Sequence, residues 1–289
     1  MSRNSSSAAK GRFRNGGPNN RSNSSGPPLT HCQCQFLSLK LNFTCLSKFI
    51  VLSLPIGHHS PLQESISRFT DGLLKSAPAV PGLDPSIAVA PRRLHLTLGV
   101  MSLVESVSPG DSLTEPPKTL SEALALLSSL GPRIKESLAE NHLCVPLQRM
   151  DIMKPDRGDP DNAHVLWLGP SFDTEDALRL KAVGELVNQA FIEGGFILDR
   201  RPLKLHCTIL NTTYRKPKSR GPRQPFSYKA LLTSSATRGF LAEPSEPSDS
   251  RQPVKVDFGT WNVDEIQICK MGSYGPAGEY VSCGGFSLL

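Results

Sequence analysis

One short pattern, Leu-His-X-Thr followed by an apolar residue, occurs twice in apolar surroundings and constrains the fold more than any other feature. The first copy lies in Arg92–Leu103, "RRLHLTLGVMSL", and the second in Pro202–Lys216, "PLKLHCTILNTTYRK". Both stretches have the apolar content of a buried β-strand, yet each carries a histidine and a threonine two residues apart. The chain therefore predicts two strands that each present a polar pair on one face.

Alternation along a strand decides which residues share that face. Successive side chains point to opposite sides, so His95 lies beside Thr97 and His206 beside Thr208. The opposite face of both strands is apolar, and we expect it in the core: Leu94, Leu96, Leu98, Leu205, Cys207 and Ile209.

Two such polar pairs, brought side by side near the middle of one sheet, match the requirements of in-line displacement at phosphorus. Imidazoles titrate near neutral pH, so one can take a proton from water or a ribose hydroxyl while the other protonates the leaving oxygen. The two threonine hydroxyls can hold the non-bridging oxygens. This chemistry requires no metal or other cofactor, and we expect none.

Chance and structural roles are the competing interpretations of these histidines. A His-X-Ser/Thr tripeptide arises on the order of once by chance in a chain of this size. A third match, "HHS" at His58–Ser60, lies between Gly57 and Pro61 and lacks a surrounding strand, so we discount it. A lone buried histidine is usually a core residue, but two copies with matched flanks favour a shared site.

Charge is distributed unevenly along the 289 residues. The first 48 residues contain seven Lys or Arg and no acid, in a Ser-, Asn- and Gly-rich context. We expect 1–48 to be a disordered basic tail and 49–289 to form the folded domain. Inside the domain, 200–242 holds ten Lys or Arg and no acid. We expect a basic Pro-rich loop at about 215–225 and a flexible insert at about 237–254. The loop can be a plain solvated linker, but its position just after the second histidine makes a phosphate-bearing ligand more plausible.

The apolar stretch 36–56 could suggest a membrane span. Lys40, Asn42 and Lys48 interrupt it and Pro55 ends it, so we expect no membrane association. Seven widely spaced cysteines without a secretory leader favour reduced thiols in an intracellular, soluble protein of the nucleus or cytoplasm. Their spacing with the histidines does not indicate a zinc site.

Strand and helix signals alternate from residue 49 onward. We expect helices over 61–75, capped by Ser60, over 118–130 with a continuation after Gly131-Pro132, and over 174–193. We expect strands over 49–56, around the two histidines, over 143–147, 164–168 and 261–269, and an edge strand over 279–289.

The two motifs, together with "FGTWNVDEIQIC" and "GEYV" further along, resemble the two-histidine (2H) phosphoesterase superfamily. They are most similar to the branch of the A-kinase anchoring protein 7-like phosphoesterase domain and the activating signal cointegrator complex subunit 1. The resemblance implies an α+β, two-lobed, pseudo-symmetric LigT-like fold with a central cleft. It also implies that His95 and His206 are catalytic and that Thr97 and Thr208 bind phosphate. Tyr214 and Arg215, in the run after the second motif, are expected to bind phosphate too.

Two functions follow from this resemblance. The first is a metal-independent phosphodiesterase that acts on RNA or nucleotide phosphodiesters, either 2′,3′-cyclic or 2′,5′-linked. The second is a non-catalytic nucleotide- or RNA-binding subunit of a nuclear transcription-coactivator and DNA-repair complex, with subunits of a cointegrator or helicase type as partners. The sequence shows no KH-type Gly-X-X-Gly loop ahead of the domain, and residues 32–48 interrupt the expected pattern as an insert or a gene-model error.

Overall fold

The structure is a computed structural model that describes residues 48–104, 117–218, 220–242 and 252–289. The expected basic tail, the interrupting segment 32–48 except Lys48, and most of the expected insert lie outside the described residues. Within the described parts, no helix has both the length and the apolar character needed to cross a membrane.

Eight strands form the main sheet in the order β10-β9-β1-β2-β6-β5-β4-β7. All of its neighbouring strands pair antiparallel. The bounds are β1 Lys48–Pro55, β2 His95–Leu103, β4 Arg149–Ile152, β5 Val165–Gly169, β6 Cys207–Asn211, β7 Val254–Lys255, β9 Glu265–Tyr274 and β10 Tyr280–Ser287. A second, two-stranded sheet joins β3 (Leu143–Pro146) to β8 (Thr260–Val263).

Six α-helices accompany these strands in the described residues: α1 Ser60–Leu74, α2 Leu120–Ser129, α3 Gly131–Leu138, α4 Glu175–Glu193, α5 Tyr228–Thr233 and α6 Ser235–Arg238. Local sequence explains where they begin. Thr119 forms a capping box with Glu122 at the start of α2, and the Thr174 hydroxyl accepts from the backbone N–H of Ala177 at the start of α4. The cap expected at Ser60 is wrong, because Ser60 is already the first helical residue and the preceding His59 makes no side-chain cap.

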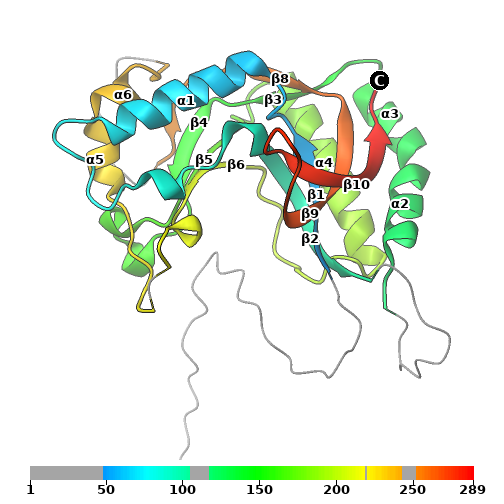
Figure 1. Ribbon diagram of the computed structural model, residues 1–289. Helices are drawn as coiled ribbons and strands as arrows, with labels where there is room; N and C mark the ends of the chain where they lie inside the picture. Colours follow the sequence, from blue (N-terminus) through cyan, green and yellow to red (C-terminus); the bar gives the residue numbers. More distant parts are fainter. Residues whose placement is uncertain (1–47, 105–116, 219, 243–251) are drawn as a thin grey trace, which may run out of the picture. The chain divides into compact units, whose positions relative to one another are not determined.

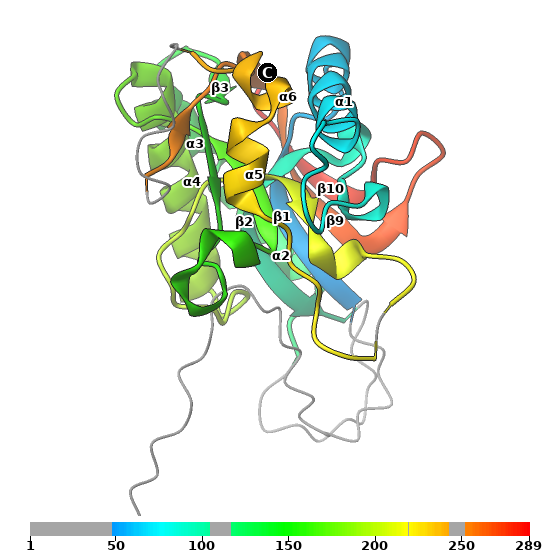
Figure 2. The same cartoon turned by 90° about the vertical axis from the view of Figure 1, so that its left-hand side faces the viewer.

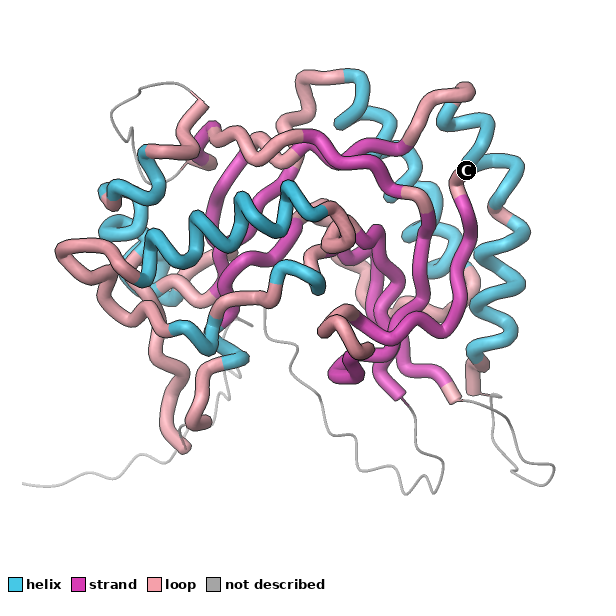
Figure 3. The backbone as a smooth tube through the Cα atoms, turned by 45° about the horizontal axis from the view of Figure 1, so that its top comes forward, coloured by secondary structure: helices cyan, strands magenta, loops and turns pink. Residues whose placement is uncertain are grey.

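The helices gather in two groups around the sheet. Figure 1 shows α2, α3 and α4 near β9 and β10, and α1, α5 and α6 near β4 and β5. Figure 2 brings α5 and α6 to the front with α1 beside them, and Figure 3 shows the strands between the two groups. One apolar core runs through the domain, from Leu52 in β1 to Phe191 in α4 and Phe226 before α5.

The predicted α+β class is confirmed by this arrangement of helices and antiparallel strands. The edge position expected for the last strand is confirmed as well, because β10 ends the sheet. The short strand β4 was missed, since four residues give too brief an alternation to be recognised.

Two expected loops fall partly in the described residues. The segment 215–225 carries neither helix nor strand where it is described. Of the expected insert 237–254, the first residues end α6 and the last residue begins β7, with Thr237 fully buried. Residues 243–251 lie outside the described part of the chain.

Candidate active site

The main sheet consists of two four-stranded halves, β10-β9-β1-β2 and β6-β5-β4-β7, which meet at the β2–β6 pair. Each half contributes one of the two motifs to this junction. His95 is the first residue of β2, and His206 comes immediately before β6. The strands expected around the histidines therefore exist, but both histidines lie at strand starts and not inside strands.

The register of β2 and β6 brings the motifs together. Leu96 pairs with Cys207 in the antiparallel direction. Continuing that register by one residue on each side sets His95 opposite Thr208 and Thr97 opposite His206, at the ~4.5–5.5 Å Cα spacing of facing residues. Each histidine thus has a threonine of its own strand on one side and a threonine of the other motif across the junction.

The apolar partners of the motifs point to the other face. Leu94, Leu96, Leu98, Leu205, Cys207 and Ile209 are all at most 5% exposed. Gly184 of α4 lies against this face, where an added Cβ would meet Leu205 and Leu98. Packing of this apolar face in the core therefore holds both strands in place, while the side chains of the histidine face are partly accessible to solvent.

Backbone contacts fix the tautomer of both imidazoles. The Nδ1 of His95 lies 2.7 Å from the carbonyl oxygen of Arg93, and the Nδ1 of His206 lies 2.7 Å from that of Lys204. Because a carbonyl oxygen only accepts, Nδ1 carries the proton in both rings, and Nε2 is the free basic nitrogen of the neutral form. The Nε2 of His95 lies 3.2 Å from the Thr97 hydroxyl.

Burial shapes the acidity of the pair. The pKa of His206 is lowered to about 4, chiefly by desolvation and also by the positive charges of Lys204 and His95, while the hydrogen bond to the Lys204 carbonyl acts in the opposite direction. Desolvation also lowers the pKa of His95. Both imidazoles are therefore neutral near pH 7, and a proton on His95 disfavours a second proton on His206.

An aromatic ring flanks each histidine. Tyr280 meets His95 edge-on with ring centroids 5.2 Å apart, and Trp167 meets His206 edge-on at 6.4 Å. The residue two positions before each histidine places its cation over a nearby ring, Arg93 over Tyr274 and Lys204 over Trp167. The two halves of the site are therefore built alike, with a cation, an aromatic group, an imidazole and a threonine.

Sequence reasoning missed four of these neighbours. Trp167, Arg93, Lys204 and Tyr280 were not among the residues predicted for the site. A signal was present for two of them, because each motif has a basic residue two positions before its histidine. Tyr280 is more than 180 residues away from His95 in sequence, and only the β1–β2 and β1–β9–β10 pairings bring it close.

Tyr214 and Arg215 lie in different surroundings. The Tyr214 hydroxyl hydrogen bonds with the side chain of Tyr280, which places it at the His95 side of the junction. The Arg215 guanidinium instead donates to the carbonyl oxygens of Gly82 at 2.5 Å and Gln224 at 3.3 Å. Arg215 thus ties the basic loop to the segment around Gly82.

The third match to the motif lies in the turn between β1 and α1. The rings of His58 and His59 lie 3.9 Å apart and are tilted by 40° to each other, and the Nε2 of His59 lies 2.8 Å from the backbone oxygen of Asn262. Across the described residues, no group of three or more His, Cys, Asp or Glu side chains is placed to hold a metal ion.

Comparisons with known proteins identify the family of this chain. The family model "AKAP7 2′5′ RNA ligase-like domain" matches residues 50–288. Activating signal cointegrator 1 complex subunit 1 of Mus musculus is 24% identical over 230 residues, which cover 77% of this chain. The match covers 58% of the length of that curated relative.

Several solved structures are also similar. E. coli LigT complexed with 3′-AMP matches 84% of this chain and 98% of its own, with 17% identity and a TM-score of 0.45. A protein of Thermus thermophilus matches 83% of this chain and 97% of its own, with 18% identity and a TM-score of 0.42. Because the family model spans both motifs and nearly all of the described domain, the chain belongs to the AKAP7 2′5′ RNA ligase-like domain family.

Proposed function

We propose that this protein is a metal-independent phosphodiesterase that acts on RNA or nucleotide phosphodiesters, with 2′,3′-cyclic or 2′,5′ linkages as substrates. One observation supports it above all: the Leu96–Cys207 register, which sets each histidine opposite the threonine of the other motif. Membership of the family supports the same class of chemistry.

In this proposal the phosphate lies between the two Nε2 atoms. One neutral imidazole takes a proton from the attacking water as its oxygen bonds to phosphorus. The other imidazole, protonated at the start, gives its proton to the ribose oxygen as the phosphorus–oxygen bond breaks. The hydroxyls of Thr97 and Thr208 donate to the non-bridging oxygens, and Tyr214 is proposed to do so from the His95 side.

The lowered pKa values of His95 and His206 in the free protein are compatible with this reaction. A bound phosphodiester carries a negative charge, which favours the imidazolium form of a neighbouring histidine. Substrate binding would therefore raise the pKa of the pair and let one imidazole keep a proton near pH 7. The hydrolysis returns the pair with the proton exchanged between its members, and exchange with water restores the starting state.

The test is hydrolysis of 2′,3′-cyclic nucleotides and short RNAs with defined ends, in the presence of a chelator. We expect turnover by the wild type and a loss of at least a hundredfold in His95→Ala and in His206→Ala, since general acid or base catalysis contributes about 10²–10⁴-fold. His142→Ala removes an exposed histidine and serves as the matched control. Turnover that needs a metal, or that survives in both variants, would refute the proposal.

A second function is favoured by one observation, the similarity to a protein whose name describes a complex subunit. In this alternative the site binds nucleotides or RNA without turnover, and the protein acts within a nuclear transcription-coactivator and DNA-repair assembly. Folded wild-type protein that binds nucleotides at the histidine pair, but hydrolyses no member of the panel, would support it.

A further inference from the structure

A pocket of about 280 Å³ lies beside the His206 half of the candidate site. Its lining combines apolar and charged side chains: Arg149, Asp151, Trp167, Pro170, Phe172, Lys181, Glu185, Leu203, Lys204, Leu205 and Pro253. Ligand pockets are typically ~300–1,000 Å³, apolar for the most part and supplied with a few placed polar groups. The volume therefore suits one small ring system and not a large ligand.

Strand pairing shows how the pocket relates to the histidines. Trp167 pairs with Thr208 of β6, and Asp151 of β4 pairs with Trp167, so these side chains share the face of the motif threonine. Arg149 pairs with Gly169 one step along. Two strand spacings, roughly 10 Å, separate Asp151 from Thr208. A ribose and its base can span this distance from a phosphate held at the histidine pair.

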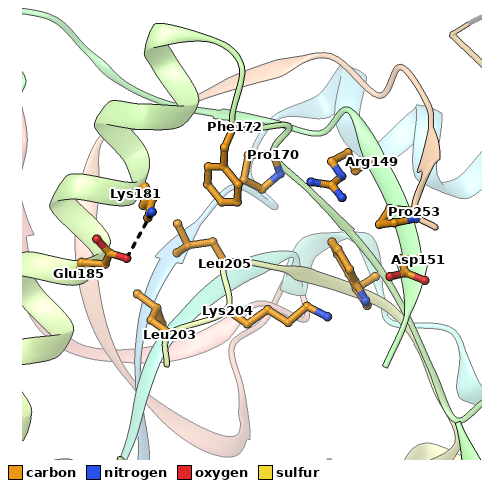
Figure 4. Close-up of a pocket in the computed structure, with 11 residues that line it drawn as sticks. Arg149, Asp151, Pro170, Phe172, Lys181, Glu185, Leu203, Lys204, Leu205 and Pro253 are labelled. Atoms are coloured by element: carbon orange, nitrogen blue, oxygen red, sulfur yellow. Dashed lines mark ion pairs between the residues drawn. The ribbon is translucent and has the colours of Figure 1, made fainter. Parts of the chain in front are cut away.

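The walls of the pocket carry different chemistry. Figure 4 shows Lys181 and Glu185 on one wall, joined as an ion pair at 3.9 Å, with Arg149 and Asp151 on the opposite wall. Leu203 and Leu205 lie between the walls, and the side chain of Lys204 extends toward Asp151. Leu205 belongs to the apolar side of the second motif, whereas Arg149 and Asp151 lie on the threonine side, so a flat ring in the pocket would meet apolar groups on one side and polar groups at its other edge.

Arg149 and Asp151 form a donor and acceptor pair on that wall. Within the described residues, no hydrogen bond or ion pair joins the two side chains. One carboxylate oxygen of Asp151 accepts from the backbone N–H of Ile152, so the other can accept from a ligand. Desolvation raises the pKa of Asp151, while Lys204 and Arg149 act in the opposite direction. The carboxylate is thus partly removed from water, where a hydrogen bond to a ligand is strongest.

We propose that this pocket holds the base of the bound nucleotide and that Asp151 and Arg149 make it select guanine. Guanine offers N–H donors on its Watson–Crick edge, which a carboxylate accepts, and the O6 and N7 acceptors, which a guanidinium recognises. At N1, guanine has an N–H donor and adenine has an acceptor, so a carboxylate that faces N1 disfavours adenine. The inference rests on the proposed function, because it assumes a nucleotide phosphate at the histidine pair.

The test compares the four bases in two measurements on the full chain. The first is kcat/KM for the four nucleoside 2′,3′-cyclic phosphates, and the second is calorimetric binding of the four 3′-monophosphates. We expect guanosine to be preferred about tenfold or more in both, the scale of one bidentate base contact. In Asp151→Asn the preference should fall below about threefold, with adenosine affinity little changed.

Two further variants keep the test decisive. Asp71→Asn removes an exposed carboxylate from α1 and should keep the guanosine preference. If Asp151→Asn is unfolded by circular dichroism, Arg149→Met replaces it and should also lower guanosine affinity selectively. Turnover of all four bases at equal rates would refute this inference and leave the proposed function standing. A guanosine preference in binding without turnover would support guanine binding in the pocket and refute the hydrolytic function. If no nucleotide binds, the assignment of the pocket to a base is refuted.

Discussion

Replacing His206 should change how the stability of the free protein depends on pH. Its pKa is lowered to about 4 in the folded state, chiefly by desolvation, and it returns to ~6.5 on unfolding. Between these values the unfolded chain binds more protons than the folded one. Stability contributed by the neutral ring is therefore fully present above pH ~6.5 and is lost as the pH falls toward 4.

The size of this effect follows from the two pKa values. At pH 5 the imidazole is almost fully protonated in the unfolded chain and almost fully neutral in the folded protein. This difference lowers the free energy of unfolding by about 2 kcal/mol relative to pH 7.5. Below pH 4 the cost approaches about 3 kcal/mol. His206→Gln removes this titration. Between pH 7.5 and pH 5 the free energy of unfolding should therefore fall less in the variant than in the wild type, and the two losses should differ by about 2 kcal/mol.

Urea unfolding at the two pH values measures this double difference. His142→Gln, which replaces an exposed histidine, controls for the loss of an imidazole as such. If the wild type and His206→Gln lose the same stability between pH 7.5 and pH 5, the desolvation of His206 is refuted. The argument for a neutral histidine pair in the free site would then fail with it.

Three further predictions concern the surroundings of the site and one helix start. Gly169→Ala would place a Cβ 2.9 Å from the Trp167 ring, so we expect a loss of about 1–3 kcal/mol in urea unfolding; an unchanged midpoint would contradict this packing. Lys204→Met removes a positive charge that lowers the pKa of His206, so that pKa should rise in an NMR titration of the ring; a fall or no change would exclude the coupling. Thr119→Ala removes the capping box of α2 and should cost about 1 kcal/mol of unfolding free energy, whereas Thr119→Ser should retain most of it.

Local pattern was sufficient for much of the fold and for the motif side of the site. The alternation around His95 and His206 predicted which side chains enter the core, and the helical spacing in 174–193 predicted α4 almost to the residue. These predictions hold because the periods of strand and helix act over a few neighbouring residues. The α+β class follows from the same local signals.

The sequence by itself determined the two polar pairs and the apolar faces behind them. Tertiary structure alone decided that the pairs meet at one junction in antiparallel register, that Tyr280 reaches His95, and that β4 brings Arg149 and Asp151 beside Trp167. It also turned Arg215 toward Gly82. Such contacts join residues far apart in the chain, and they depend on strand order and on closure of the sheet, which no local periodicity encodes.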